Sequence, residues 1–412
     1  MKRLAIAVLI ASGLGPSAAL AWDWSLKTSE SETVELNSNQ FLRTNPAGSV
    51  GSYTTLTANA EALTPISKFN FDANGSYKKY WGPGVAGTAS EFLNYNVHAR
   101  YQQDGKNRFD REFIETNWSQ QSTALAILND LGVLVPAEGF LDRLTATGGI
   151  DRSVSARDTI SLLATSTRTS YEPLSAGTPF TDTLARGNWR HSFNSTTAGS
   201  LSSEAELLDY DNAFGTQVGI YRNQIGVDTT LSPLLSFRAN VGAALVATDR
   251  GVSTSPSGGG LSATPTSNSA IDWIGDAVLT YKFLKTAMLS VVAGQSIGPS
   301  VVGSLVKRDT LTASVNYIIN SRENLTFSAS GNRQIAGTTT DYASASVTYG
   351  YAPFRDLLLQ FTYRYQHRFQ STGTTIIDPV TNTPTVSGLA PADSHALLFV
   401  ATHNFVALPH GY

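Results

Sequence analysis

The feature that most constrains this chain is a set of long segments in which apolar and polar residues alternate one by one. In the segment 357–369, Leu357, Phe361 and Tyr365 fall on one face, whereas Gln360 and Arg364 fall on the other. Successive side chains of a strand point to opposite faces, so this pattern predicts a β-strand with one apolar and one polar face. The segment is more than twice as long as the usual strand of about five or six residues.

The same alternation recurs along the chain. It is clear in the segments 68–78, 93–101, 235–245, 310–319 and 324–330. The segments 109–118 and 216–228 alternate poorly, which predicts β-bulges there or a register other than the one assigned from the alternation.

The connections between these segments are of two kinds. Eight are short and nine are longer and rich in Gly, Pro or Thr, and the two kinds mostly take turns along the chain. This count predicts 18 strands, with 16 as the alternative, and both chain ends on the side of the short turns. The short turns lie near residues 64, 105, 155, 196, 232, 285, 322 and 353, and the long connections include 294–306 and 335–341.

Long two-faced strands with alternating short and long connections are typical of a transmembrane β-barrel. A sheet in lipid must close on itself, because every backbone donor and acceptor has to be paired within the protein. The predicted fold is therefore all-β: an antiparallel up-and-down transmembrane barrel in the bacterial outer membrane. The rival folds are a β-sandwich, whose strands are shorter, and a β-helix, which would show a repeat of constant period.

The first residues predict a cleaved signal peptide. Lys2 and Arg3 precede a short apolar core, and Ala19 and Ala21 form an A-x-A cleavage site. The alternative, an uncleaved membrane helix, is disfavoured because the core is too short to span a bilayer. We therefore expect a signal peptide at 1–21, a single barrel domain at 22–405 and a short tail at 406–412.

Composition excludes several classes of protein. The chain has no cysteine, which excludes a disulfide scaffold, a thiolate metal site and a lipoprotein anchor. Its net charge of −3 gives no basic footprint for nucleic acid. With six histidines in 412 residues, we expect no metal site and no cofactor.

Two motifs carry chemistry in other proteins. Gly294–Gly298 matches G-x-S-x-G, but no helix is predicted after it, so we interpret it as part of a loop and expect no enzyme activity. An acidic group is expected in another loop, where it is solvated or bridges lipopolysaccharide through divalent ions; binding of Ca²⁺ is the alternative. This group comprises Glu204, Glu206, Asp209, Asp211 and Asn212.

The lumen is the predicted functional surface. A charge on the lipid face near the midplane costs about 2–4 kcal/mol, so charged strand residues are assigned to the inner face. Opposed cationic and acidic walls would orient a passing solute; the alternative is that these charges only pair with one another. Tyr221 and Tyr342 are assigned inward by parity. The predicted lumen-lining residues are Lys68, Asp72, Lys78, Arg100, Arg238, Asp272, Asp276, Lys282, Arg364 and Arg368. The segment 120–140, with its leucines, is the predicted plug.

The two ends of the mature chain carry a family resemblance. Ser394–Phe405 resembles the C-terminal strand of Gram-negative outer-membrane proteins, and Trp24–Asn37 resembles the first strand of the exopolysaccharide-locus-associated β-barrel porin family. The first similarity implies that Phe405 is an assembly signal read by the barrel-assembly machinery. The second implies a role in exopolysaccharide export, with a polysaccharide export apparatus as a partner beside outer-membrane lipid and lipopolysaccharide.

The sequence therefore favours an outer-membrane channel that passes hydrophilic solutes by diffusion. The first alternative is a structural or adhesive barrel with a plugged lumen, which would act through its extracellular loops. The second alternative is an outer-membrane barrel enzyme.

Overall fold

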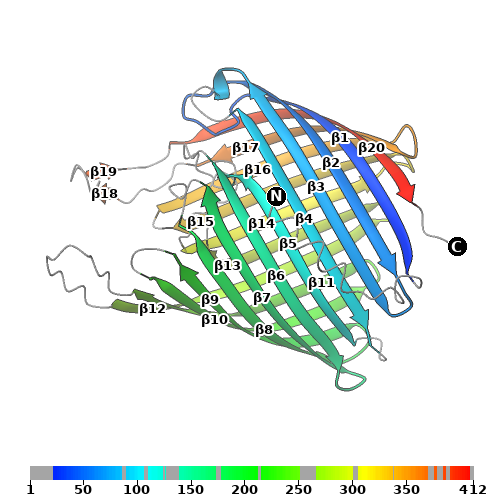
Figure 1. Cartoon of the computed structure of the whole chain (residues 1–412), viewed down its shortest axis with the longest axis vertical. Coiled ribbons are helices and arrows are strands. Elements are labelled where there is room, and N and C mark those ends of the chain that lie inside the picture. The colour runs from blue at the N-terminus through cyan, green and yellow to red at the C-terminus, as the bar shows by residue number, and fades with distance from the viewer. Residues whose placement is uncertain are drawn as a thin grey trace.

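The computed structural model shows a closed antiparallel barrel of 18 strands (Figure 1). It describes residues 22–85, 90–105, 110–123, 126, 139–172, 178–211, 215–250, 266–299, 305–336, 338–369, 375–377, 384–386 and 390–408. The predicted fold class and strand number are confirmed.

Each barrel strand pairs with its neighbours in the chain, and β1 closes the barrel by pairing with β20. A separate two-stranded ribbon joins β18 (Thr375–Ile377) and β19 (Pro384–Val386). The barrel strands are β1 (Asp23–Asn37), β2 (Ser49–Leu63), β3 (Ser67–Trp81), β4 (Glu91–Asp104), β5 (Arg111–Ser122), β6 (Phe140–Ser153), β7 (Asp158–Glu172), β8 (Phe180–Ser192), β9 (Thr197–Tyr210), β10 (Gln217–Ser232), β11 (Leu235–Arg250), β12 (Thr266–Leu284), β13 (Ala287–Pro299), β14 (Leu305–Ile318), β15 (Glu323–Ala336), β16 (Thr338–Tyr351), β17 (Leu357–Arg368) and β20 (Ala392–Leu408).

The eight short turns lie where the sequence predicts them, at one end of the barrel. Both the start of β1 and the end of β20 are at this end, since Leu26 pairs with Leu408. By the usual asymmetry of outer-membrane barrels, the short-turn end is periplasmic and the other end extracellular. Strands of 12 to 19 residues exceed the roughly 9–11 that cross a bilayer, so they extend beyond it.

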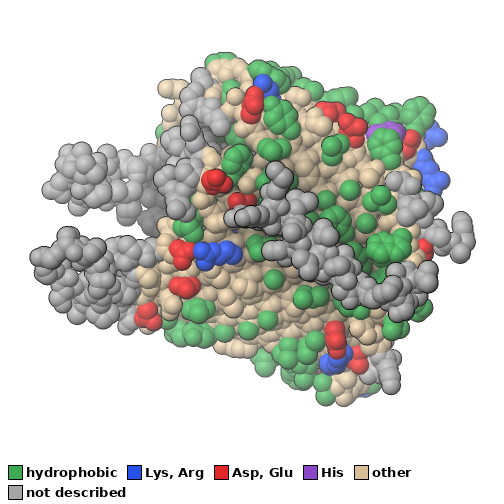
Figure 2. Space-filling view, viewed as in Figure 1, with side chains coloured by type: hydrophobic (Ala, Val, Ile, Leu, Met, Phe, Trp, Pro, Cys, Tyr) green, Lys and Arg blue, Asp and Glu red, His purple; other side chains and the backbone are tan. Residues whose placement is uncertain are grey.

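The outer face of the barrel is apolar. Large hydrophobic side chains exposed on it include Leu144, Leu201, Ile225, Val241 and Leu311. Figure 2 shows hydrophobic side chains across the middle of the outer surface and most charged ones toward its two ends. A closed sheet with such a face is suited to lipid, and the chain is a bacterial outer-membrane β-barrel. Among the described residues, no helix has the length and apolar character needed to cross a membrane.

Two segments fold into the lumen at the extracellular end. The first is the β1–β2 connection, residues 38–48, which lies beside the 3₁₀ turn η2 (Pro83–Val85) of the β3–β4 connection. Its Phe41 packs with Tyr53, Tyr80 and Phe92 from the inner faces of β2, β3 and β4. This inner aromatic cluster fixes the connection against the wall.

The second segment comprises the extracellular ends of β13 and β14. The β12–β13 ladder stops at the pair Gly275–Gln295, whereas β13 stays paired with β14 up to Pro299. Beyond the last β12–β13 pair, Ile297 and Leu305 pack against a buried cluster that includes Ile220 and Ile274 on the inner faces of β10 and β12. The two strand ends therefore form a second layer on the inner wall, which we call the folded-in ends.

Several expectations about connections and strands were wrong. Within the described strands, residues 111–118 and 217–228 contain no bulge; their ladders run without a register shift. Alternation is weak there because apolar side chains also point inward: Ile220 lies under the folded-in ends, and Phe113 lies under the guanidinium of Arg100.

Two predicted loops are largely strand. The segment 294–306 belongs mostly to β13 and β14, and β15 and β16 meet at the pair Ala336–Thr338 where a loop at 335–341 was expected. The chain after Phe405 also differs from a free tail. Val406 pairs with Lys27, and after a bulge Leu408 pairs with Leu26, so β20 continues to Leu408.

Candidate functional site in the barrel lumen

All ten predicted lumen residues occupy inner-face register positions of their strands. Most of them are paired with a side chain of opposite charge or with another polar group of the chain. The contacts are Lys68 with Glu61, Asp72 with His98, Arg100 with Glu115, Arg238 with Asp228, Asp272 with Lys307, Asp276 with Asn240, Arg364 with Glu35 and Arg368 with the Ala390 carbonyl. Lys282 lies close to the periplasmic turn, and Lys78 is described with the cavity below.

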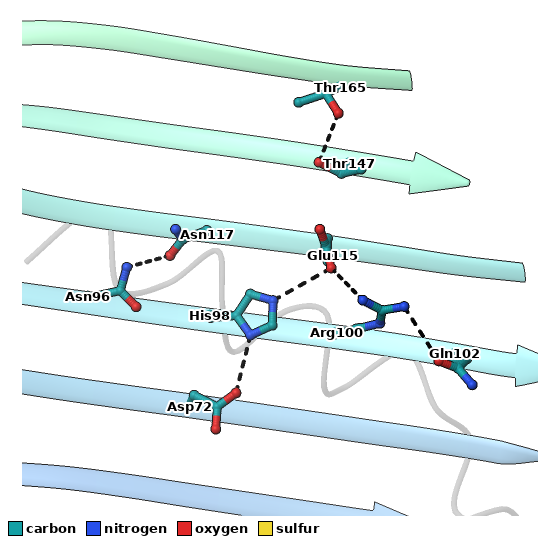
Figure 3. A network of polar contacts seen from close by, with 9 residues as sticks. All are labelled: Asp72, Asn96, His98, Arg100, Gln102, Glu115, Asn117, Thr147 and Thr165. Carbon is teal, nitrogen blue, oxygen red and sulfur yellow. Dashed lines mark hydrogen bonds and ion pairs between the residues drawn. The ribbon is translucent and has the colours of Figure 1, made fainter. Parts of the chain in front are cut away.

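The charges of the lumen are therefore arranged as neighbouring pairs of opposite sign, and not as the opposed cationic and acidic walls that the sequence predicted. On β3–β5 the pattern forms one network (Figure 3). His98 Nδ1 lies 3.2 Å from Asp72 Oδ2, and its Nε2 lies 3.8 Å from Glu115 Oε2. Arg100 donates to the same Glu115 oxygen at 3.1 Å. The inner surface here is charged but locally balanced.

The wall formed by β15–β17 is polar but largely uncharged. Hydroxyl groups of adjacent strands hydrogen-bond in cross-strand pairs, including Ser328 with Ser346 and Ser330 with Ser344, both at 2.7 Å. Thr348 and Thr362 form a further pair at 2.9 Å. This wall offers hydroxyl groups to water or to a solute.

A cavity of about 460 Å³ lies in the lumen between β2–β3 and β15–β17. We call it the lumen cavity. The residues that matter for its chemistry are Glu35, Lys78, Tyr80, Gln334, Tyr342 and Arg364. Arg364 donates to Glu35 at 2.9 Å, and the Lys78 ammonium lies 5.1 Å from the centre of the Tyr53 ring. The lumen cavity therefore combines aromatic rings, an amide and three charged groups.

A chain of hydrogen bonds ties the segment 38–48 to the rim of this cavity. Asn37 donates to Glu35 at 3.0 Å and accepts from the Asn39 backbone at 2.9 Å. The Asn39 side chain donates to the carbonyls of Arg43 and Asp393 at 2.8 and 3.0 Å, and it accepts from the Arg43 amide at 2.9 Å. Because Asn39 is only 2% exposed, these bonds are shielded from water.

A second charged group lies under the folded-in ends. Arg222 of β10 pairs with Glu204 and Glu206 of β9 and donates to the Ile297 carbonyl at 2.7 Å. Its side chain is 14% exposed and that of Glu206 is 4% exposed. Arg222 thus links the barrel wall to the folded-in ends.

Two predictions about individual residues were wrong. Tyr221 points outward and is 52% exposed, since it shares the parity of Ile225, whereas Tyr342 does lie on the inner face. The acidic group does not lie together in a loop: Glu204, Glu206 and Asp209 belong to β9, where the first two pair with Arg222, whereas Asp211 follows the strand and pairs with Arg168. Among the described residues, no group of three His, Asp or Glu side chains is placed to hold a metal ion.

The G-x-S-x-G motif lies in β13, where Ser296 is paired with Arg308 of β14. A nucleophile elbow requires a turn from strand to helix, so the motif has the wrong local structure here. Three other predictions fall outside the described residues: the signal peptide with Ala19 and Ala21, residue Asn212, and most of the predicted plug at 120–140. In the part that is described, Ala126 is buried.

The functional groups that sequence reasoning missed are Glu35, Asn39, Arg222 and Gln334. Glu35 follows two outward-facing acidic residues, Glu30 and Glu32, so β1 gives no alternation that would mark its inner face. Gln334 and Asn39 are uncharged and resemble any other wall or loop residue. Arg222 shares its inner face with Ile220, which hid the polar side of β10.

No family model matches this chain, and no curated protein matches it. Solved structures with similar folds are outer-membrane proteins. OccAB2 from Acinetobacter baumannii is 10% identical, with 93% of this chain and 98% of that chain covered and a TM-score of 0.45. OccK2 (OpdF) from Pseudomonas aeruginosa is 10% identical, with 93% of this chain and 98% of that chain covered and a TM-score of 0.46. The ferric-catecholate import receptor Fiu from E. coli K12 is 11% identical, with 92% of this chain and 81% of that chain covered and a TM-score of 0.44. Similarity at this level carries no information on a solute.

Proposed function

We propose that this barrel is a passive channel that lets small hydrophilic solutes cross the outer membrane. The observation that carries the proposal is the contrast between the two faces of one sheet. The outer face is apolar, whereas the inner face presents balanced ion pairs on β3–β5 and hydroxyl pairs on β15–β17. Barrels of about 16–18 strands are wide enough to enclose water.

The segment 38–48 and the folded-in ends narrow this channel from two sides. Both occupy the extracellular half of the lumen, so a solute has to pass between them before it reaches the periplasmic half. Movement would be diffusion past polar groups, and the ion pairs leave little net charge to repel either sign of ion. Small uncharged and singly charged solutes fit this wall best.

Single-channel conductance in a planar bilayer tests the proposal. The refolded chain, shown by circular dichroism to be β-structured, should give a steady current that falls when a short oligosaccharide is added. An absence of current from folded protein would contradict an open channel. A link to polysaccharide export remains a prediction of the family resemblance.

The competing function is a structural barrel with a closed lumen. The specific observation in its favour is that both inward segments are held by apolar packing and by buried polar contacts, at Phe41 and at Arg222. In that case the folded chain gives no current, and loosening the segment 38–48 does not restore one.

A further inference from the structure

Three residues that line the lumen cavity each carry a buried polar atom that has no hydrogen-bond partner within the described part of the chain. They are Gln334 Oε1 and Asn332 Oδ1, which are acceptors, and Arg364 Nε, which is a donor. A buried polar group without a partner costs free energy, so such atoms are normally satisfied by water or by a ligand. Here the three residues that carry the two acceptors and the donor all line the same cavity.

From this arrangement we propose that the lumen cavity is a binding site for a sugar acid, that is, a polyhydroxylated solute that carries one carboxylate. Hydroxyl groups of the solute would donate to Gln334 and Asn332, and an oxygen would accept from Arg364. The inference rests on the proposed channel function and adds a solute class to it.

The charge of the cavity selects a carboxylate over a neutral sugar. Lys78 and Arg364 bring two positive charges, and Glu35 brings one negative charge that already accepts hydrogen bonds from Arg364 and Asn37. One positive charge is left in excess in a recess that is partly shielded from bulk water. An ammonium in such a place favours an anionic group, because charge-assisted hydrogen bonds are the stronger ones.

The shape of the cavity suits a compact ring. Its volume of about 460 Å³ lies within the range of about 300–1,000 Å³ found for small-molecule sites. Tyr80 of β3 and Tyr342 of β16 both line the cavity, so aromatic side chains reach it from two separate strands. Leu42, which also lines the cavity, has a left-handed backbone with φ of 49°. Such strain is kept only where the surroundings impose it and is common at ligand sites.

Calorimetric titration of the folded chain in detergent tests the proposal without requiring a current. The probes are sodium glucuronate and glucose, which share a ring and differ at one carboxylate. Glucuronate should bind at least tenfold more tightly than glucose. Lys78→Met should weaken glucuronate about tenfold and leave glucose nearly unchanged, since only the charge is lost.

Two further variants separate the contacts. Gln334→Leu should weaken both probes by a similar factor, because a hydroxyl loses its acceptor in either case. Arg238→Met is the matched control: it also removes a cation from the inner face, but one that pairs with Asp228 away from the cavity, and it should leave both affinities unchanged. Circular dichroism of each variant shows whether the barrel has folded.

Equal affinity for the two probes, or a Lys78→Met variant that binds glucuronate like the wild type, would overturn the proposal. Absence of heat with either probe at millimolar concentration would mean that water alone satisfies the buried atoms, which also overturns it. If the protein conducts but binds neither probe, the proposed binding site is refuted and the proposed channel function stands. Binding without conductance removes the channel and keeps the site.

Discussion

Replacing Asn39 by Ala should release the segment 38–48 from the barrel wall. The substitution removes three side-chain hydrogen bonds, two donated to the carbonyls of Arg43 and Asp393 and one accepted from the Arg43 amide. Each such bond contributes about 1 kcal/mol, and Asn39 is buried, so the segment should lose about 3 kcal/mol of local stability. The population in which it is detached should then rise about a hundredfold.

Limited digestion with trypsin and hydrogen exchange measure this release. Arg43 is the arginine within the segment 38–48, so cleavage after it reports detachment. Amides of the segment should exchange faster in Asn39→Ala, whereas those of β5 and β6 should not change. Channel current should rise, because the segment occupies the extracellular half of the lumen.

Asn194→Ala is the matched control for this experiment. The Asn194 side chain also takes part in three local hydrogen bonds, with Thr196 and Thr197, but it lies in an exposed turn at the periplasmic end. It should leave exchange and cleavage in the segment 38–48 unchanged. If Asn39→Ala behaves like this control, the reasoning that polar contacts of one residue hold the segment is refuted.

Three other changes test separate parts of the structure. Arg222→Met leaves the buried Glu206 without its cationic partner and should lower stability by about 3–5 kcal/mol, measured as faster hydrogen exchange of the 295–299 amides. The control Arg238→Met, at an exposed ion pair, should lower stability by less than about 1 kcal/mol. Equal effects of the two variants would argue against a link between Arg222 and the folded-in ends. Val241→Arg on the outer face should lower the free energy of unfolding in lipid vesicles by about 2–4 kcal/mol, whereas Asn240→Arg on the inner face should not. A larger loss for Asn240→Arg than for Val241→Arg would mean that the inner and outer faces of β11 are assigned the wrong way round. Phe405→Ala should reduce the amount of barrel assembled in cells while refolding in detergent stays normal; a matching loss in both assays would mean a structural role for the ring rather than a signal.

The sequence was sufficient for the barrel because the lipid imposes a simple rule on every strand. Leu357, Phe361 and Tyr365 must face outward, so parity also places Arg364 inward without knowledge of its neighbours. The rule fails where a strand meets protein on its inner side. Ile220 is apolar and points inward because the folded-in ends cover it. The sequence of β10 alone does not indicate that another part of the chain packs on its inner face.

The site was harder to predict because its contacts join distant parts of the chain. Glu35 and Arg364 are separated by more than 300 residues, and Asn39 reaches the carbonyl of Asp393. A charged residue in an alternating strand indicates which face it occupies, but it does not indicate which side chain will pair with it. The pairing of charges with neighbours, in place of two opposed walls, depended on cross-strand register that alternation alone does not fix.

The closure of the barrel between β1 and β20 has a consequence for the order of folding. All other barrel pairings join strands that follow one another along the chain, whereas this one joins Leu26 to Leu408. Closing so long a loop costs about 4 kcal/mol more than closing a tight hairpin, by the logarithmic dependence on length. The hairpins can therefore form early, and the β1–β20 seam should be the last ladder to zip. Changes along that seam would slow completion of the barrel without disturbing any single hairpin.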